Sequence, residues 1–469
     1  MNLTKVTQQI CQHLWMRSPD PELNLYWYWL QTLVLILPLN NAVSPVFAMF
    51  LLGLFLVRRG WRDLDSPVNR GWLVLAGWLA IATLLAFDVS VAWTGLWNFL
   101  PFFLLFAIAA FLIQTTAQFQ HLAYLWVVSS IPVGALGVIQ ALINRPNWFL
   151  PRLFGSYEIS LGFSQDGRVT SLFGHYNEAA LYLALVLPIA CHFALGKVKD
   201  KVGNGKRQQV IAAIALGLGI ATLMLAGSRN AWAIVALGFV VLAIYYRFWY
   251  LVVGLSLSAG SIAWAAWGSF LGIGGEWLRP LFPGGFINRL TSTFDPSQKD
   301  FVSTLYRLDA WQYALRLIQQ HPIQGWGLRS FDLIAATQGY DLKGLPHEHN
   351  FYLALAVGAG LPALFGFLGI VGWIIYWGLK AKLSPQIKGL VAVTVVAIAL
   401  YLIFGMLDVV FYEPRINILS WLLLAGVYGV STCAIGDRDL TISNENAPDT
   451  SLARDRNHRD ATGDSAQSV

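Results

Sequence analysis

The chain has 469 residues, of which 56% are hydrophobic and only 12% are charged. Ordinary soluble domains carry about 25% charged residues, so this composition argues strongly against one large water-soluble core and favours a membrane protein. The net charge of +6 does not indicate nucleic-acid binding, because lysine and arginine gather in short loops beside apolar runs. That arrangement is the topology signal of a membrane protein, so membrane lipids are the expected surroundings.

Residues 1–25 are mixed in polarity and are predicted to form an N-terminal cytoplasmic segment. A cleavable signal peptide is not expected, because the first strong apolar run begins near Tyr26, has no small-residue cleavage site and is soon followed by another apolar run. The three cysteines, Cys11, Cys191 and Cys433, show neither a disulfide framework nor a metal-binding spacing.

Several apolar runs approach the roughly 20 residues that a membrane-spanning helix needs, and with the shorter runs the sequence predicts an all-α polytopic membrane protein with about twelve transmembrane helices. The first nine lie within residues 26–271 and the last three within residues 351–434. In order, the runs are residues 26–38, 43–57, 71–87, 91–113, 122–143, 177–195, 210–227, 231–246, 250–271, 351–379, 390–410 and 416–434. The first two are short for a bilayer core of about 30 Å.

Basic loops determine the predicted orientation. One lies at residues 58–70, a second at 197–207 and a third at Lys380 and Lys382, and the alternation of spans puts all three on one side. The positive-inside rule makes that side cytoplasmic. Both termini are then predicted to be cytoplasmic, and the polar tail of residues 435–469 is predicted to be disordered.

Residues 272–350 are predicted to form one large loop on the outer side. The loop contains an amphipathic helix over residues 301–320, followed by Pro322, which would stop it. Its apolar residues recur at three- and four-residue steps, as one helix face requires: Leu305, Leu308, Trp311, Leu315 and Ile318.

The predicted topology brings basic and histidine residues from distant parts of the chain to the outer face: Arg168, Arg229, Arg307, His347 and His349. Arg229 lies in a minimal turn between two spans, where a cation facing lipid would be costly, although a guanidinium reaching the headgroups fits equally well. Arg307 flanks the apolar stripe of the loop helix. A solvated position is the simpler interpretation for Arg307, as for Arg316 and Arg329.

Arg168 precedes the entry to the sixth span, and a planar guanidinium suits phosphate oxygens. His175 and Asn177 follow it, and a helix-capping role is the simpler interpretation of both.

His349 can accept a proton near neutral pH and is a candidate general base. Its neighbour Glu348 cannot be assumed to orient it, because adjacent side chains often point apart. His347 and His349 alone are a weak metal signal with no evident third ligand, so no metal site is predicted.

Four groups of residues then follow one another along the chain. They are Arg168, Gly174 and Asn177; Ser228-Arg229 with Trp232; Arg307 and Trp311 with Pro322 and Gly325-Trp326-Gly327; and His349-Asn350 with Gly358 and Gly360. This ordered set, over residues 168–361, resembles the O-antigen ligase family. That family groups lipopolysaccharide O-antigen ligases, O-antigen polymerases and bacterial protein O-oligosaccharyltransferases. Within it, the chain is similar to cyanobacterial members named for inorganic-carbon (bicarbonate) transport.

The resemblance implies a glycosyltransferase of the GT-C type in the plasma (inner) membrane, with its active site in the periplasm. The donor would be a glycan on undecaprenyl diphosphate, and the acceptor a hydroxyl of lipid A core, a protein or a glycan. Neither a metal, a nucleotide nor another cofactor would take part. The large loop would then be periplasmic, covering the site and holding the acceptor.

Site residues also follow from the resemblance. It makes His349 the base that deprotonates the acceptor hydroxyl, and Arg229 and Arg307, joined by Arg168, the groups that hold the diphosphate. The supporting residues are His347, Asn350, Asn177 and Trp311. The pair His175-Tyr176 departs from the family pattern, in which a small turn residue is usual. His347 leaves the identity of the base open, and the register with Asn350 favours His349.

Two other functions are compatible with the sequence. A transporter for bicarbonate or another anion would use the same arginines, but transport sites usually lie near the bilayer midplane, and here the polar residues lie at helix ends. A membrane subunit that only scaffolds a partner would not need the histidine.

Overall fold

The computed structural model describes residues 15–39, 41–143, 167–196, 205–282, 284–292 and 295–445. These residues form helices and no strands, which confirms the all-α class. Most of the expected N-terminal segment, much of the second basic loop and the end of the expected C-terminal tail lie outside the described residues.

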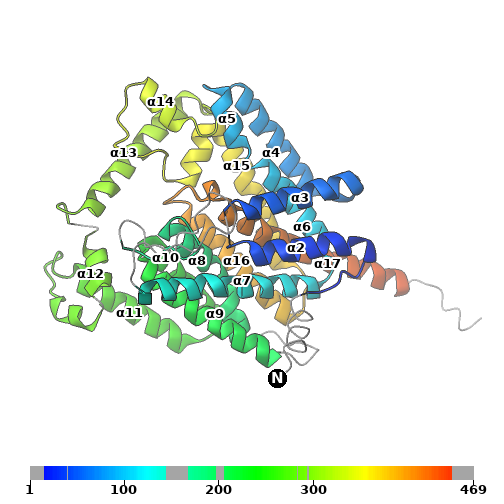
Figure 1. Ribbon diagram of the computed structural model, residues 1–469, viewed down its shortest axis with the longest axis horizontal. Coiled ribbons are helices and arrows are strands. Elements are labelled where there is room, and N and C mark those ends of the chain that lie inside the picture. Colours follow the sequence, from blue (N-terminus) through cyan, green and yellow to red (C-terminus); the bar gives the residue numbers. More distant parts are fainter. Residues whose placement is uncertain are drawn as a thin grey trace, which may run out of the picture.

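Each of the twelve expected spans coincides with one or two helices (Figure 1). These are α2 (Asn24–Ile36), α3 (Val43–Arg58), α4 (Pro67–Leu84), α5 (Val89–Leu96), α6 (Leu100–Leu112), α7 (Thr116–Ile143), α8 (Tyr176–Ala194), α9 (Gly205–Ala226), α10 (Arg229–Tyr245), α11 (Trp249–Trp267), α15 (Phe351–Lys380), α16 (Pro385–Phe404) and α17 (Pro414–Glu445). The fourth expected span is divided into α5 and α6, because the chain turns before the proline at the start of α6.

The large loop and the other connections contain short helices. These are η1 (Pro21–Leu23), η2 (Arg62–Leu64), η3 (Glu276–Leu281), α12 (Gly284–Thr291), α13 (Lys299–Gln320), α14 (Phe331–Thr337) and η4 (Val410–Tyr412).

Among the described residues, eight helical stretches are long and apolar enough to cross a membrane. They are Val89–Leu112, which joins α5 and α6, and the helices α7, α8, α9, α11, α15, α16 and α17 up to Cys433. The helices α3 and α10 are apolar but shorter. The chain is therefore a polytopic membrane protein, and the count of twelve spans stays a prediction.

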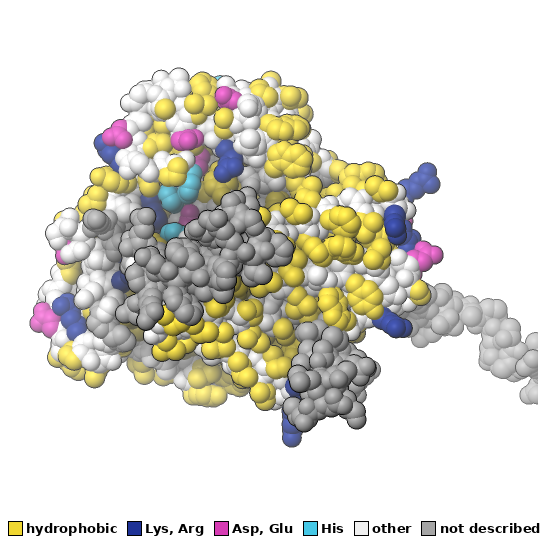
Figure 2. Space-filling model, in the orientation of Figure 1, with side chains coloured by type: hydrophobic (Ala, Val, Ile, Leu, Met, Phe, Trp, Pro, Cys, Tyr) yellow, Lys and Arg dark blue, Asp and Glu magenta, His cyan; other side chains and the backbone are white. Residues whose placement is uncertain are grey.

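The core of the bundle surrounds α8, which packs against α7, α9, α10 and α16. Helix α17 packs against α6 and α15, and hydrophobic side chains cover much of the described surface on the face shown in Figure 2. Helices α13 and α14 lie apart from the main bundle at one end of α15 (Figure 1). An outer surface this apolar is expected where the bundle faces lipid tails rather than water.

Helix α15 is interrupted at Gly360, whose φ of 80° breaks the helical path. A side chain there would collide with the carbonyl oxygen of Ile323, which approaches the position of a Cβ atom within 1.7 Å. The carbonyl groups before the break are paired with other segments. The N–H groups of Trp326 and Gly327 donate to the carbonyls of residues 357 and 358 at 2.7 and 2.9 Å, and the indole of Trp78 donates to that of residue 359 at 2.9 Å. A broken helix at membrane depth needs such partners.

The amphipathic helix of the loop forms as expected, but the predicted buried face is largely wrong. Three leucines of the predicted stripe are between 45% and 51% exposed: Leu305, Leu308 and Leu315. The face that packs against α15 and α14 instead carries Ala310, Tyr313, Ala314, Leu317 and Ile318. Small alanines let α13 approach its neighbours closely. The periodicity of large hydrophobic residues does not reveal such close packing.

Candidate active site

The histidine segment, residues 346–350, leads into α15. The side-chain oxygen of Asn350 accepts hydrogen bonds from the backbone N–H groups of Tyr352 and Leu353 at 2.9 and 3.1 Å, so Asn350 caps the helix. Its side-chain amide donates to the carbonyl oxygen of Met406 at 3.0 Å, and the next backbone N–H donates to that of Gly405 at 2.7 Å. The start of α15 is thereby joined to the end of α16.

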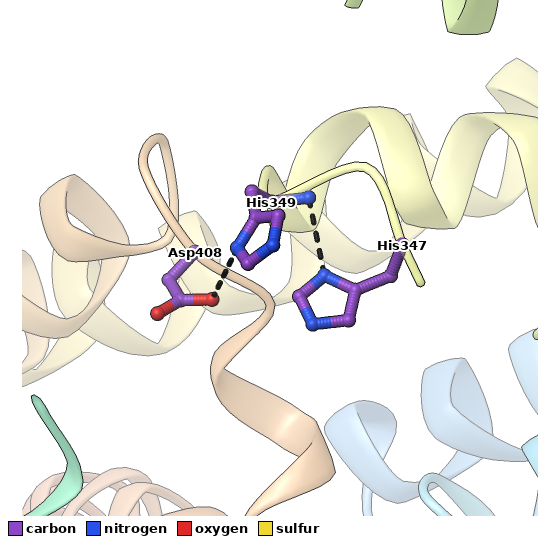
Figure 3. Close-up of side chains that lie close together, drawn as sticks. All are labelled: His347, His349 and Asp408. Carbon is purple, nitrogen blue, oxygen red and sulfur yellow. Dashed lines mark hydrogen bonds and ion pairs between the residues drawn. The ribbon is translucent and has the colours of Figure 1, made fainter. Parts of the chain in front are cut away.

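His349 faces Asp408 from the connection between α16 and α17 (Figure 3). Its Nδ1 lies 3.3 Å from Oδ1 of Asp408, and its backbone N–H donates to Nδ1 of His347 at 3.2 Å. With the Nδ1 proton directed to the carboxylate, Nε2 of His349 keeps its lone pair. The residue also has a φ of 47°, which is uncommon for a residue with a side chain and is typical of functional sites.

Asp408 is ionised at neutral pH. Burial alone would raise the pKa of its carboxyl group, but the hydrogen bond with His349 and the charges of His349 and His347 hold the pKa below its usual value. The backbone N–H of Val409 also donates to Oδ1 of Asp408 at 2.9 Å. A charged carboxylate is thus placed to orient the imidazole and to stabilise it once it is protonated.

His347, His349 and Asp408 could also be considered as metal ligands, because their ligand atoms lie within 4.8 Å of one another. Hydrogen bonds occupy one nitrogen of each histidine. Nδ1 of His347 already accepts from a backbone N–H, and Nδ1 of His349 already faces the carboxylate. Zn²⁺ needs deprotonated nitrogen lone pairs, so these nitrogens would have to leave their present partners to bind it. These hydrogen bonds involve only the Nδ1 atoms, so the arrangement is compatible with an acid–base pair and with a metal held through Nε2.

Glu348 points away from this pair into the protein and is only 3% exposed. Its backbone carbonyl accepts a hydrogen bond from the indole of Trp311 at 2.9 Å. Burial raises the pKa of its carboxyl group to about 8, with repulsion from Asp332 adding to the effect and a hydrogen bond from its own backbone opposing it. Glu348 is therefore protonated at neutral pH, and Asp408 rather than Glu348 orients His349.

Arg307 and Trp311 lie one turn apart on α13 and share the side that faces the histidine segment. The charge of Arg307 also acts on His347. Burial and the neighbouring His349 lower the pKa of His347 to about 4. The positive charges of Arg307 and Arg329 contribute to this lowering of the pKa, against the attraction of Asp408.

Arg329 belongs to this site, although the sequence gave it no role beyond a solvated position. It follows the turn at Gly327, has a φ of 61°, and places its guanidinium carbon 4.6 Å above the ring centre of Tyr412. Tyr412 in turn stands edge-on to His347, with ring centres 5.7 Å apart. The isolated sequence contains no signal for this contact, because it joins two connections about 80 residues apart.

A second group of basic residues, the arginine cluster, consists of Arg168, Arg229 and Arg289. It surrounds the turn between α9 and α10. A Cβ atom on Gly227 would lie 3.4 Å from Nε of Arg289 and 3.7 Å from Cδ of Arg168, so both side chains pass this glycine. Arg229 donates to the carbonyl oxygen of Arg289 at 3.3 Å, and the guanidinium carbon of Arg168 lies 4.0 Å above the ring centre of Tyr176. Arg289, on α12, was not predicted as a site residue.

The entry to α8 connects the arginine cluster with the histidine segment. His175, not Asn177, is the cap residue, because Nδ1 of His175 accepts from the N–H of Asn177 at 3.2 Å. Glu178 accepts from the backbone N–H of His175 at 3.2 Å. Glu178 and Asp408 are near enough to interact electrostatically, which places the α8 entry beside the orienting carboxylate.

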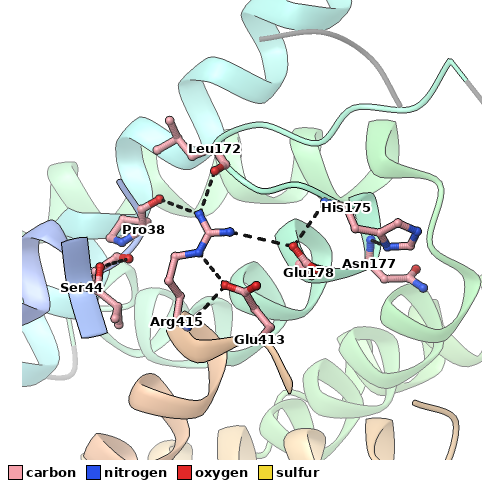
Figure 4. Close-up of polar contacts among 9 residues, drawn as sticks. Pro38, Ser44, Leu172, His175, Asn177, Glu178, Glu413 and Arg415 are labelled. Carbon is pink, nitrogen blue, oxygen red and sulfur yellow. Dashed lines mark hydrogen bonds and ion pairs between the residues drawn. The ribbon is translucent and has the colours of Figure 1, made fainter. Parts of the chain in front are cut away.

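Arg415 holds this region together and is only 2% exposed (Figure 4). Its Nε lies 2.6 Å from a carboxylate oxygen of Glu413, and it donates to the carbonyl oxygens of Leu172 and Pro38 at 2.8 and 3.4 Å. Glu178 lies 3.9 Å from the same guanidinium. A buried charge with this many partners is a structural clamp, and losing one partner is typically costly.

The predicted site residues therefore fall into two neighbouring groups. His347, His349 and Arg307 lie together, with Trp311 and Asn350 supporting the backbone around them, while Arg229 and Arg168 lie together in the arginine cluster. Histidine side chains are visible in a hollow beside α13 and α14, with acidic and basic side chains next to them (Figure 2). Asp408, Arg329, Arg289 and Arg415 are the polar residues that the sequence did not single out for this region.

The fold and the site define a helical, polytopic membrane protein whose ionisable groups gather at the ends of its helices and in one large loop. Residues 214–368 match the family model described as O-antigen ligase. The match covers about a third of the chain and supports the O-antigen ligase family, which the ordered motifs predicted. The matched range contains Arg229, Arg289, Arg307, His347 and His349. No curated protein matches the chain.

The family match supports a glycosyltransferase of the O-antigen ligase or polymerase type. Arg168 and Asp408 lie outside the matched residues, and the structure brings both to the site region. The match does not address inorganic-carbon transport, which stays a prediction.

Proposed function

We propose that the protein transfers a glycan from a polyprenyl diphosphate, such as undecaprenyl diphosphate, to an acceptor hydroxyl at the periplasmic face of the inner membrane. The observation that carries the proposal is the His349–Asp408 pair with Arg307 beside it, in a chain that matches the O-antigen ligase family model. In this proposal both termini are cytoplasmic, the fold is of the GT-C type, and the reaction needs no metal.

His349 is the general base. Its Nε2 takes the proton of the acceptor hydroxyl while that oxygen forms a bond to the anomeric carbon of the glycan. The bond between the anomeric carbon and the diphosphate oxygen breaks, and the diphosphate leaves with the electron pair. Asp408 keeps the imidazole in the required tautomer and stabilises its protonated form.

The arginines bind the diphosphate, whose negative charge rises as the bond breaks. Arg307 lies on the histidine side, and Arg229 and Arg168 lie in the arginine cluster, where Arg289 joins them. Guanidinium groups offer planar pairs of donors that match phosphate oxygens, and charge that is already in place stabilises the leaving group without reorganisation. His347, Trp311, Asn350 and Asn177 are supporting residues in this proposal.

The test is transfer by the full-length protein in proteoliposomes, supplied with the lipid-linked glycan and acceptor of its own cells. The His349→Ala variant is expected to lose about 10²–10⁴-fold in transfer rate, the usual contribution of a general base. Lys343→Ala, at an exposed ion pair of the same loop, serves as a matched control and should transfer normally. Unchanged transfer by His349→Ala would rule out the mechanism.

A transporter predicts a different result. Labelled bicarbonate would then enter proteoliposomes that contain only the pure protein, and lipid-linked glycan would remain unused. A robust bicarbonate flux without glycan transfer would replace the proposed function by that alternative.

A further inference from the structure

Residues 268–282, which connect α11 to α12, expose an unusual density of large apolar side chains. Five of them are between 63% and 73% exposed: Phe270, Leu271, Ile273, Trp277 and Leu281. Single exposed hydrophobic residues are normal on a protein surface, but a contiguous group of this kind marks a surface that contacts something apolar.

This exposure belongs to a folded segment. The guanidinium of Arg279 donates to the carbonyl oxygen of Ala265 at 3.0 Å, and the indole of Trp264 donates to that of Ile273 at 3.2 Å. Leu278 is buried against Ala265 in a small core of its own. These contacts fix the backbone of η3, and with Leu278 buried the neighbouring side chains are held on the outer side.

The exposed apolar surface of residues 268–282 is continuous with the exposed apolar surface of α11. Only 11% of the apolar stretch of this helix is buried within the protein, so lipid is the expected neighbour of most of it. Trp264, near the end of α11, is half-exposed and stands edge-on to Trp277, with ring centres 5.7 Å apart. The apolar surface thus passes from a membrane-facing helix to the connecting segment without interruption.

We propose that residues 268–282 form an interfacial platform that lies in the bilayer, at the level of the headgroups and upper acyl chains, on the same side as the candidate active site. Tryptophans are enriched at this level, because their rings combine an apolar body with a polar N–H group. The platform lies along the membrane surface, with its apolar side toward the acyl chains and its backbone paired to the end of α11.

The platform also positions residues of the arginine cluster. Helix α12 begins directly after it, and the ring of Phe286 lies 4.6 Å from that of Trp232 on α10. Trp267, the last residue of α11, donates from its indole to the carbonyl oxygen of Leu290 at 3.1 Å. Arg289 is therefore held at a depth in the membrane interface that the platform determines. This inference stands without the proposed transfer reaction.

The test measures the surroundings of spin labels on the full-length protein in phospholipid vesicles. Cys11, Cys191 and Cys433 are replaced by serine, and single cysteines are introduced as Ile273→Cys, Trp277→Cys or Leu281→Cys. Ser297→Cys, in an exposed polar turn of the same loop, is the matched control. The thermal unfolding midpoint of each labelled protein in detergent is compared with that of the unlabelled chain, which shows whether the label is tolerated. Because three separate positions are labelled, one poorly tolerated label does not decide the outcome.

Labels on the platform are expected to collide readily with dissolved oxygen, which partitions into lipid, and rarely with a water-soluble nickel chelate. The label at Ser297→Cys should show the reverse ratio. Platform labels that report water, as the control does, would overturn the proposal. Labels screened from both reagents would also overturn it, because another protein chain rather than lipid would then cover the surface.

Discussion

The histidine segment and the arginine cluster each depend on one residue with a left-handed backbone, but they use it in opposite ways. At His349 a residue with a side chain adopts a φ of 47°, at a cost of roughly 1–2 kcal/mol. At Gly227 a glycine adopts a φ of 64° at little cost, and the missing side chain leaves space for Arg168 and Arg289. One region holds a reactive side chain in a strained position, and the other leaves room for charged side chains.

Long-range hydrogen bonds offset the strain at the histidine segment. Asn350 bonds the carbonyl of Met406, and His349 bonds Asp408, so the α16–α17 connection determines where the imidazole points. At the arginine cluster the turn itself is short and local, between α9 and α10. We therefore expect changes at the histidine segment to affect the rate of the chemical step alone, and changes at the arginine cluster to affect both donor binding and the departure of the diphosphate.

The largest effect is expected for Asp408→Asn. The amide cannot hold the imidazole in the required tautomer or stabilise its charge, so kcat for transfer should fall by about 10²–10⁴-fold. The KM for the lipid-linked donor should change little, because Asp408 contacts His349 and not the arginine cluster. Steady-state transfer at varied donor concentration measures both constants. A raised donor KM with unchanged kcat would contradict the assignment.

Arg229→Ala should have the next largest effect, a loss of about 10²–10³-fold in kcat/KM, because one charged group that stabilises the leaving diphosphate is removed. Arg229→Lys should restore only part of this, since an ammonium lacks the planar fork of donors. Arg316→Ala is the control, as its guanidinium lies over the ring of Tyr340 on the far side of α13. Equal losses in the two alanine variants would show a general charge effect.

Gly227→Val should raise the donor KM by about tenfold, the equivalent of about 1.4 kcal/mol. The outer atoms of valine would have to displace Arg289 or Arg168, whereas the single Cβ of Gly227→Ala fits beside both and adds only backbone strain. Gly339→Val is the matched control, because its φ of 68° gives the same strain with open space around it. Donor KM, measured for all three, should change only in Gly227→Val, and a similar change in the Gly339 variant would contradict this interpretation.

The smallest expected effect concerns pH and Glu348. The folded pKa of about 8 is above the ordinary value of 4.5, so the contribution of this carboxyl group to stability is full below about pH 4.5 and is lost as pH rises through about 8. Glu348→Gln should therefore weaken the decline of the thermal midpoint on the alkaline side.

The acid side provides an internal control for that experiment. The pKa of His347 is lowered to about 4, so its contribution is present above its ordinary value of 6.5 and is lost as pH falls through about 4. Glu348→Gln should leave this acid-side decline unchanged. An identical alkaline decline in the variant and in the wild type would show that Glu348 does not cause it.

Most of the helical framework could be predicted from the sequence, because long apolar runs have few alternatives in a membrane. The breaks were harder to predict. The division between α5 and α6 and the interruption of α15 at Gly360 both lie inside continuous apolar runs, where composition does not change. The buried face of α13 was misjudged because the leucines marked the exposed side and the alanines the packed side.

The candidate site was predictable in part. His349, Arg229 and Arg307 stand in ordered motifs, but the partners that define their surroundings come from other connections of the bundle. The sequence assigned no role to Asp408, and Arg289 lies in a segment with no distinctive pattern. Such pairings depend on how loops approach one another in space, and a single sequence carries no direct record of those distances.

The interruption of α15 limits how the lipid-linked donor of the proposed reaction can enter. Two carbonyl groups at the break accept from the N–H groups of Trp326 and Gly327, so the part of the loop around residues 322–327 is hydrogen-bonded to the wall of the bundle. Lifting this part of the loop would leave the carbonyls of residues 357 and 358 unpaired in apolar surroundings, each at a cost of several kcal/mol. That part of the loop is therefore expected to stay in place and not to open and close over the site. In the proposed reaction, the isoprenoid chain of the donor would therefore enter sideways, between helices, and its head would reach His349 from within the plane of the membrane.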